Sequence, residues 1–156
     1  MTATSWLVRP VRGDELEAWA RLFADYAAFY GVPTSPEHQR QIWGWIHDER
    51  LVEALVAVPV DAEGQETGAP LGLAHLRSWV RPLRGVVCGY LDDLYVDPAA
   101  RGRGAVAALF DEIRRVAGER GWPTVRWTTA EDNYRARTVY DRVATRTTWV
   151  TYDLTA

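Results

Sequence analysis

The segment 86–107 constrains the fold of this chain more than any other part of the sequence. Its first part reads VVCGYLDDLYV, which predicts a strand, and this strand ends at Asp97-Pro98 because a proline cannot continue a ladder. Two glycines and two arginines follow as RGRG, and a helical pattern begins at Gly104. A strand that passes through a glycine-rich turn into a helix predicts an α/β (α+β) fold.

Strand and helix patterns alternate along the rest of the chain. Apolar residues at helical spacing predict helices, and β-compatible runs bounded by Gly, Pro and Asp predict strands. Ser35 followed by Pro36 marks a helix start, with an N-cap candidate and a proline in the first turn. The expected order is β-α-α-β-β-β-α-β-α-β, with strands at 6–11, 51–58, 71–80, 86–96, 124–129 and 147–154 and helices at 14–30, 35–46, 104–117 and 133–144.

Length and composition indicate one domain over residues 1–156. Apolar residues make up 47% of the chain and charged residues 25%, the ordinary mix for a soluble globular protein. The linker-like stretch 61–70 lies between two predicted strands and is expected to be a hairpin loop. No stretch approaches the roughly 20 apolar residues that span a bilayer, and residues 1–10 lack the pattern of a leader, so we expect a cytoplasmic protein with no membrane partner.

Residue usage excludes several kinds of chemistry. All 18 basic residues are arginine, which excludes Schiff-base and P-loop lysine chemistry. One cysteine, Cys88, cannot form an intramolecular disulfide, and His38, His47 and His75 are scattered without ligand spacing, so we expect no metal. The net charge of −3 disfavours a nucleic-acid partner, since such binders usually carry a basic face.

The densest chemical signal is the turn at Arg101, Gly102, Arg103 and Gly104. Glycines let the backbone point N–H groups at an anion, a helix N-terminus adds free N–H groups and a positive dipole end, and arginines add charge-assisted bonds. The turn therefore predicts a phosphate site. A surface turn with solvated arginines stays open. A dinucleotide fingerprint through Gly102, Gly104 and Ala107 is disfavoured, because five residues separate the first glycine from the strand.

Two adjacent carboxylates, Asp92 and Asp93, lie inside the predicted strand 86–96. Burial of carboxylates within an apolar strand destabilises the fold unless they are paired, solvated or needed for function. Alternation of side chains predicts that Asp92 shares a face with Tyr90 and Leu94 and that Asp93 lies on the opposite face.

A third candidate lies on the predicted helix 133–144, where Asn133 and Tyr140 share one face because they are seven residues apart. Asn133 lies at the helix start and Tyr140 two turns along it. Both side chains are expected to reach toward a groove beside the neighbouring strand. A plain N-cap for Asn133 and a buried structural tyrosine at 140 stay open as alternatives.

These residues resemble the GCN5-related N-acetyltransferases (GNAT), which transfer an acetyl group from acetyl-coenzyme A to an amine. The family's turn is Q/R-x-x-G-x-G/A, and residues 101–106 read RGRGAV, with Val106 in place of the usual small residue. The segments LDDLYVDPAARGRG and EDNYRARTVYDRVA look most like polyamine and small-amine acetyltransferases and a yeast group that acts on histones, polyamines or D-amino acids. The resemblance implies a splayed, largely antiparallel mixed sheet flanked by helices.

The resemblance also implies roles for individual residues. Backbone groups of one strand end hold the pantetheine arm, the turn holds the pyrophosphate, Asn133 contacts the arm and Tyr140 faces the thiol. A homodimer is typical of the family. The implied coenzyme A-binding residues are Leu94, Tyr95, Val96, Arg101, Gly102, Arg103, Gly104, Ala105, Val106, Asn133 and Tyr140.

The chemistry expected on this basis is direct attack of a small primary amine on acetyl-coenzyme A in a ternary complex. An alkylamine has a pKa near ~10.4 and must lose a proton, for which Asp92 is the candidate base with Asp93 assisting or binding the cation. Tyr140 is the candidate acid for the departing thiolate. Acids and aromatics of the first helix, Asp25, Tyr26 and Tyr30, are expected to bind the acceptor.

Three other functions remain open at the level of sequence. The first is acetylation of a protein N-terminus or lysine, and the second is a non-catalytic acyl-coenzyme A sensor. A covalent route through Cys88 is the third, and it is disfavoured because a thiol inside an apolar strand is more often inert.

Overall fold

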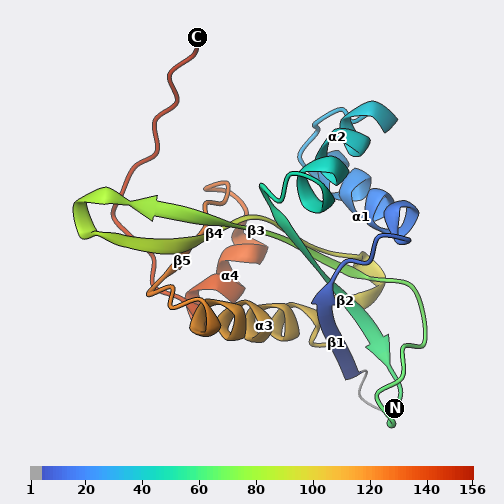
Figure 1. The fold of residues 1–156 in the computed structure, drawn as a ribbon. Helices are drawn as coiled ribbons and strands as arrows, with labels where there is room; N and C mark the ends of the chain where they lie inside the picture. Colours follow the sequence, from blue (N-terminus) through green and yellow to red (C-terminus); the bar gives the residue numbers. More distant parts are fainter. Residues whose placement is uncertain (1–4) are drawn as a thin grey trace.

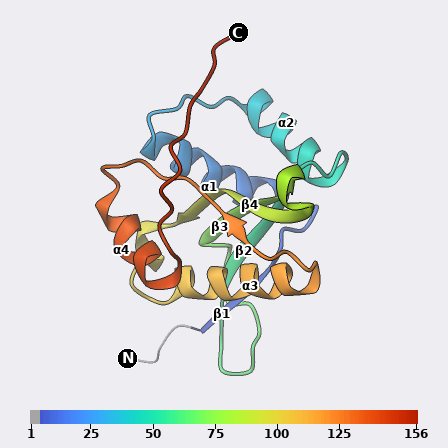
Figure 2. The same cartoon turned by 90° about the vertical axis from the view of Figure 1, so that its left-hand side faces the viewer.

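The computed structural model describes residues 5–156, in which a twisted sheet separates two layers of helices (Figures 1 and 2). The strands lie side by side in chain order, and all neighbours are antiparallel except the last two, which are parallel. The mixed, mainly antiparallel sheet confirms the predicted fold class. The strands are β1 (Ser5–Pro10), β2 (Glu53–Val60), β3 (Gly72–Arg81), β4 (Val86–Val96) and β5 (Val125–Arg126).

Helices cover both faces of the sheet (Figure 2). Helices α1 (Leu16–Phe29) and α2 (Pro36–His47) bury Trp19, Leu22 and Ile42 against one face. Helix α3 (Ala105–Glu119) buries its apolar side on the other face, and α4 (Tyr134–Val143) lies beside it. None of the helices in residues 5–156 has the length and apolar composition that crossing a membrane requires.

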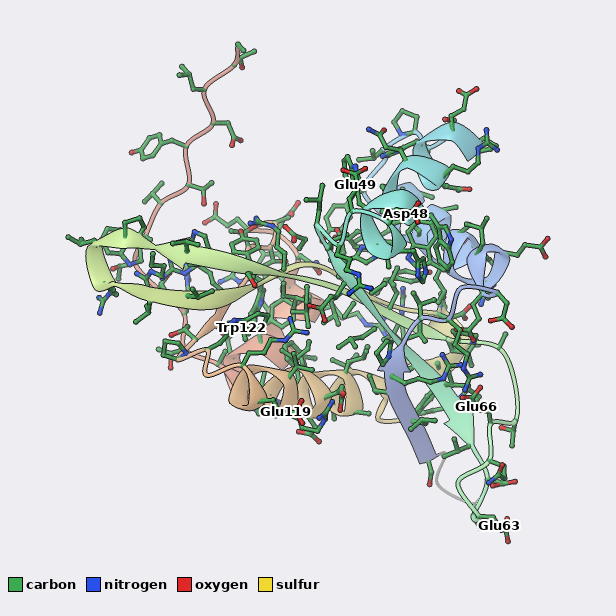
Figure 3. All side chains as sticks on the ribbon, in the orientation of Figure 1. Asp48, Glu49, Glu63, Glu66, Glu119 and Trp122 are labelled. Atoms are coloured by element: carbon green, nitrogen blue, oxygen red, sulfur yellow. The ribbon has the colours of Figure 1, made fainter. Side chains whose placement is uncertain are left out.

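Local signals in the sequence placed several boundaries correctly. The Ser35 hydroxyl accepts a hydrogen bond from the His38 N–H at 3.1 Å, which confirms the N-cap of α2. The loop 61–70 joins antiparallel β2 and β3 as expected, and Glu66 within it accepts hydrogen bonds from Arg9 and Arg12. These ion pairs hold the loop against β1 at the base of the sheet (Figure 3).

The prediction of a last strand at 147–154 is wrong. Residues 145–156 form neither helix nor strand, and in Figure 1 they run away from the sheet to the C-terminus. Strand β5 is also shorter than predicted, with only Val125 and Arg126 paired to β4. A strand needs hydrogen-bonding groups on a neighbour, and the two paired residues of β5 at the sheet edge are too short a partner for the tail among the described strands.

An irregularity in β4 overturns the predicted orientation of the two adjacent carboxylates. His75 of β3 pairs with Asp93, but the next residue of β3, Leu76, pairs with Leu91, so Asp92 is an extra, unpaired residue. This β-bulge resets the alternation of side chains. Leu91 packs on the α3 side and Tyr95 on the α1 side, although they are four residues apart. Asp92 and Asp93 consequently face the same side of the sheet.

Gly89 of β4 is expected to tolerate no side chain. A Cβ at this position would lie 2.5 Å from the ring of Trp122, which lies between the end of α3 and the sheet (Figure 3). We expect Gly89→Ala to lower the free energy of unfolding by about 2–3 kcal/mol, measured by urea denaturation, because overpacking displaces an indole from a filled core. The matched control is Gly118→Ala, in an exposed turn of α3 with nothing within 4 Å, which should stabilise slightly. Equal stability of the two variants would contradict this account.

Candidate active site

The turn before α3 has the geometry of an anion cradle. Gly102 and Gly104 adopt φ of 75° and 91°, a region that disfavours any residue with a Cβ. Neither glycine makes a backbone N–H hydrogen bond to another group in residues 5–156, and the first N–H groups of α3 have no partner within the helix. Val106, the departure from the family pattern, packs against the apolar core. The predicted turn is therefore open where a phosphate would approach.

The two arginines of the turn have different environments. The Nε of Arg101 donates to the carbonyl of Val96 at 3.0 Å, so this side chain fastens the turn to the end of β4. The side chain of Arg103 is exposed, while its carbonyl accepts a hydrogen bond from the indole of Trp6 at 2.7 Å. Arg101 thus shapes the turn, and Arg103 is the arginine whose guanidinium lies in solvent.

The turn gives a test of coenzyme A binding that is separate from catalysis. We expect Gly104→Ala to weaken coenzyme A binding roughly tenfold or more in calorimetry, because a Cβ strains the left-handed backbone whose N–H groups would face the anion. Gly64→Ala is the matched control: Gly64 has φ of 79°, open surroundings and a place in the distant loop 61–70. Both variants should lose stability, and unchanged affinity in Gly104→Ala would remove the turn from the binding site.

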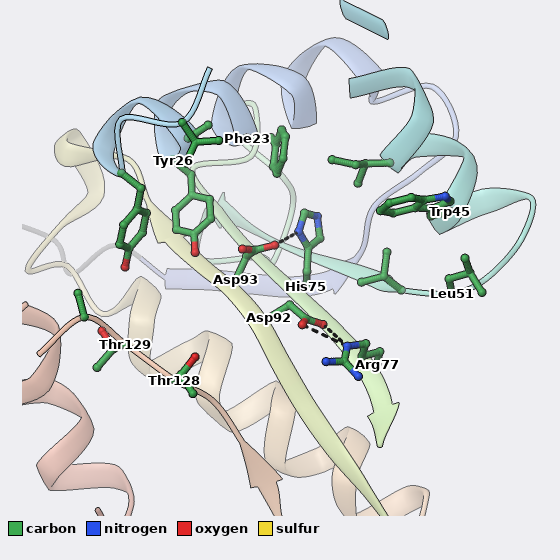
Figure 4. Close-up of a pocket in the computed structure, with 16 residues that line it drawn as sticks. Phe23, Tyr26, Trp45, Leu51, His75, Arg77, Asp92, Asp93, Thr128 and Thr129 are labelled. Atoms are coloured by element: carbon green, nitrogen blue, oxygen red, sulfur yellow. Dashed lines mark hydrogen bonds and ion pairs between the residues drawn. The ribbon is translucent and has the colours of Figure 1, made fainter. Parts of the chain in front are cut away.

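The end of β4 that leads into the turn is not paired with β5. The two strands pair only at Gly89 and Tyr90 of β4, so the strand end holding Leu94, Tyr95 and Val96 is paired to β3 alone among the described strands. One edge of this strand end is therefore open. The segment 128–130, which follows β5, lies across the opening from β4 (Figure 4).

A pocket of about 830 Å³ lies between α1, α2 and the strands β3 and β4 (Figure 4). Its floor is polar, with both carboxylates of the bulge directed into it, and its walls are largely apolar and aromatic. The predicted acceptor residues Tyr26 and Tyr30 line this pocket, but Asp25 does not, and its carboxylate lies 3.7 Å from Arg21. The polar floor consists of His75, Arg77, Asp92 and Asp93.

Asp93 ends a chain of hydrogen bonds that begins at the buried Trp19. The indole N–H of Trp19 donates to Nε2 of His75 at 3.0 Å, so the hydrogen of the imidazole is assigned to Nδ1. That Nδ1 lies 2.8 Å from Oδ2 of Asp93 and donates to it. Burial raises the pKa of Asp93, but the hydrogen bonds from His75 and from Tyr26 outweigh it, so the net pKa lies below its ordinary value. Asp93 therefore stays a carboxylate.

Asp92 has a different environment. Its two carboxylate oxygens accept hydrogen bonds from the Nε of Arg77 at 3.1 and 2.9 Å. Burial raises the pKa of Asp92 above 3.8 and outweighs the opposing charge of Arg77, and the charge of Asp93 raises it further. Two neighbouring carboxylates thus have pKa values displaced in opposite directions, an arrangement that separates an ion-binding group from a proton acceptor.

Tyrosines gather where the pocket meets the open edge of β4. Burial, followed by the neighbouring Tyr30, raises the pKa of Tyr140 to about 12, so its hydroxyl keeps its proton at neutral pH. Asn133 caps α4 through its Oδ1, which accepts from Ala136 at 3.3 Å. Its Nδ2 donates to the Tyr30 hydroxyl at 3.4 Å. The predicted pair Asn133 and Tyr140 is thereby brought together with Tyr30.

Three residues of this site were not predicted from the sequence. His75 lacks metal-ligand spacing in the sequence, and neither Trp19 nor Arg77 was singled out. Their roles depend on pairing between β3 and β4 and on packing of α1, which join residues 15 to 56 positions apart. The sequence did indicate that Asp92 and Asp93 need partners or solvent, but it did not indicate which residues provide them.

Comparison with known proteins now identifies the fold. The family model described as "Acetyltransferase (GNAT) family" matches residues 15–144. The chain belongs to this family. It is 33% identical over 150 residues to the D-amino-acid N-acetyltransferase HPA3 of Saccharomyces cerevisiae, a match that covers 94% of this chain and 88% of that protein.

Solved structures share the GNAT fold at low sequence identity. A ribosomal-protein-alanine N-acetyltransferase from Brucella melitensis superposes with a TM-score of 0.79 at 23% identity, covering 97% of this chain and 99% of the other. The aminoglycoside N-acetyltransferase AAC(6')-Iy, solved in complex with CoA, gives 0.80 at 17% identity, covering 99% and 97%. The chain is accordingly a GNAT enzyme, an acetyl-coenzyme A-dependent acyltransferase.

Proposed function

We propose that the chain acts as one catalytic domain that acetylates the primary amine of a small molecule. The observation that carries this proposal is the convergence of Asp92 and Asp93 on one pocket of about 830 Å³, with pKa values displaced in opposite directions. The printed name of the yeast relative, an amino-acid N-acetyltransferase, supports an acceptor of this size. The pocket suits a molecule whose one ammonium group pairs with Asp93, which stays ionised.

Acetyl-coenzyme A fits the other half of the site. Its pyrophosphate would be held by the backbone N–H groups of Gly102, Gly104 and the first turn of α3, which have no protein partner in residues 5–156. The open edge at Leu94, Tyr95 and Val96 would hold the pantetheine arm, and Asn133 would contact it. The bound substrate supplies the acetyl thioester.

The acid–base steps follow from the two carboxylates and the tyrosine. Asp93 binds the ammonium group, and Asp92, directly or through water, accepts a proton so that the nitrogen lone pair becomes available. The nitrogen forms a bond to the acetyl carbon and the carbon–sulfur bond breaks, while an N–H near Leu94 stabilises the oxyanion. Tyr140 gives its proton to the departing thiolate and regains one through solvent from the second proton that the amine loses, while Asp92 releases its proton to solvent.

The pH dependence of the rate tests the role of Asp92. Its raised pKa means that kcat/KM should fall as the pH drops through a value above 3.8, because the protonated carboxyl no longer accepts a proton. In Asp92→Asn this acid limb should disappear and the remaining rate should be roughly 100-fold lower. An acid limb that persists in the variant would exclude Asp92 as the base.

Release of free thiol from acetyl-coenzyme A, followed with a thiol-reactive dye, tests the function itself. The acceptor panel contains amino acids of both hands, polyamines, aminoglycosides and lysine-bearing peptides. The enzyme has no lysine, so acetylated lysine in a product comes from the acceptor alone. Thiol release with small amines is the expected result. Release only with peptides would replace the proposal with protein acetylation, and stabilisation by coenzyme A without any release would replace it with a sensor.

The proposal includes a homodimer, for which the tail is the supporting feature. Trp149, Val150, Tyr152 and Leu154 are between 72% and 98% exposed, so this apolar extended segment is left largely uncovered by the rest of residues 5–156. A second copy that covers it would remove this surface from water. Light scattering of the full chain should give twice the monomer mass, and a chain ending at Arg146 should give the monomer mass if the tail forms the contact.

A further inference from the structure

Arg77 has more hydrogen-bonding capacity than the protein uses. Its Nε donates to Asp92, while its terminal Nη groups donate to no acceptor in residues 5–156. The guanidinium rests on the ring of Tyr90, 4.6 Å from the centroid, and lies at the pocket floor beside Asp92 (Figure 4). Two donor groups in a rigid fork therefore remain available, and a planar fork matches a carboxylate.

The charges of the pocket favour a zwitterion over a simple cation. Arg77 balances one of the two carboxylates, which leaves Asp93 as the net negative charge. A monoamine would satisfy Asp93 and leave the Nη groups of Arg77 unused. A diamine would bring a second cation toward a guanidinium, which is repulsive. An acceptor with one ammonium and one carboxylate satisfies both groups.

The spacing suits an α-amino acid. Asp93 of β4 pairs with His75 of β3, and Arg77 lies two residues beyond His75, about 6.6 Å from it along the strand, so both side chains belong to the same pocket floor. The ammonium and carboxylate of an α-amino acid are attached to one carbon, and a hydrogen bond of about 2.9 Å at each end lets one small molecule contact two side chains of this floor.

The remaining wall of the pocket is apolar. Phe23 of α1, Trp45 of α2 and Leu51 after α2 line the cavity on the side of the helices (Figure 4), and Ile42 of α2 also lines it. An acceptor held at Asp93 and Arg77 directs its third substituent toward this wall. Burial of an apolar or aromatic side chain there is favourable, and burial of a charged one is not.

We propose that Arg77 anchors the carboxylate of the acceptor, so that the enzyme selects free α-amino acids with apolar side chains. This inference rests on the proposed function, since it places the ammonium group at Asp93. Arg77 is then a specificity residue that discriminates amino acids from amines. Because Arg77 is also hydrogen-bonded to Asp92, the group that binds the substrate carboxylate lies next to the group that accepts the proton.

The test compares phenylalanine with phenethylamine, which has the same ring and amine but no carboxylate. In the wild-type enzyme kcat/KM should favour phenylalanine at least tenfold. In Arg77→Gln this ratio should collapse toward one, because only phenylalanine loses a charged contact, worth ~100-fold. Arg81→Gln is the matched control, since Arg81 lies on the same strand over Trp79 and outside the pocket, and it should keep the wild-type ratio.

Two results would overturn the inference. The first is a wild-type enzyme whose kcat/KM for phenethylamine or 1,5-diaminopentane equals that for phenylalanine. The second is an equal loss of kcat/KM for phenylalanine and phenethylamine in a folded Arg77→Gln variant, which would mean that Arg77 only holds Asp92. Arg77→Lys, which keeps the charge but not the fork, should restore part of the ratio. Calorimetric binding of phenylalanine to the enzyme–coenzyme A complex, weakened in Arg77→Gln, tests the anchor without turnover. Absence of thiol release from any acceptor would count against the proposed function instead.

Discussion

Replacement of Asp93 by asparagine is expected to lower kcat/KM for the acceptor by roughly 100-fold to 4,000-fold, mostly through KM. Asparagine keeps the shape of the side chain but removes the charge that faces the ammonium group. Removal of one partner from a buried charged pair costs about 3–5 kcal/mol, and each 1.4 kcal/mol is a factor of ten. Initial rates of thiol release at varied acceptor concentration measure the effect.

The pattern of the loss distinguishes this role from a structural one. Asp93→Asn should leave the affinity for coenzyme A, measured by calorimetry, close to that of the wild type, because the turn at Gly102 and Gly104 lies on another part of the fold. Asp92→Asn should lower kcat more than it raises KM. If Asp93→Asn lowers kcat alone and keeps KM, the ammonium group is bound elsewhere.

Tyr140→Phe is expected to lower kcat about 100-fold with little change in either KM. Its pKa of about 12 keeps the hydroxyl protonated at neutral pH but also makes it a weak acid, so we expect the lower end of the 10²–10⁴-fold that general acid catalysis typically contributes. The ring itself packs against Trp127 and Phe110, and phenylalanine preserves these contacts. Thermal unfolding of the variant should therefore match the wild type.

A tyrosine on the same helix provides the control. Tyr134, at the start of α4, is 71% exposed and contacts Arg137 through its ring. Tyr134→Phe removes the same hydroxyl group and should keep the wild-type kcat. A folded Tyr140→Phe enzyme with full turnover would exclude Tyr140 as the acid and leave solvent to protonate the thiolate.

The sequence was sufficient wherever the decisive interaction is local. Ser35 caps α2 within three residues, and the glycines of the turn before α3 adopt the left-handed backbone that their position suggested. The prediction that Asp92 and Asp93 lie on opposite faces of the sheet was wrong, because a bulge is a property of the pairing between two strands. The last strand was wrong for a similar reason: alternating apolar residues indicate strand preference, but a strand also requires a partner.

The site itself could be predicted only in part. Asp92, Asp93, Tyr26, Tyr30, Asn133 and Tyr140 were named from the sequence, and the structure gathers them around the pocket and the open edge of β4. His75 and Arg77 were missed, because nothing near them in the chain distinguishes them from strand residues with ordinary structural roles. Their partners come from the next strand and from α1.

Because of the bulge in β4, the carboxylate of Asp92 can be gained or lost without a change in the pairing of the strands that form this pocket. Asp92 is one residue in excess of the pairing between β3 and β4, so a deletion of that single codon would leave Asp93 opposite His75 and restore simple alternation from Leu91 to Tyr95. Both cores would keep their side chains. Evolution can thus add or remove a second carboxylate here by a change in chain length, and related enzymes with and without this residue would share a scaffold while differing in the pH range and the acceptors at which they work.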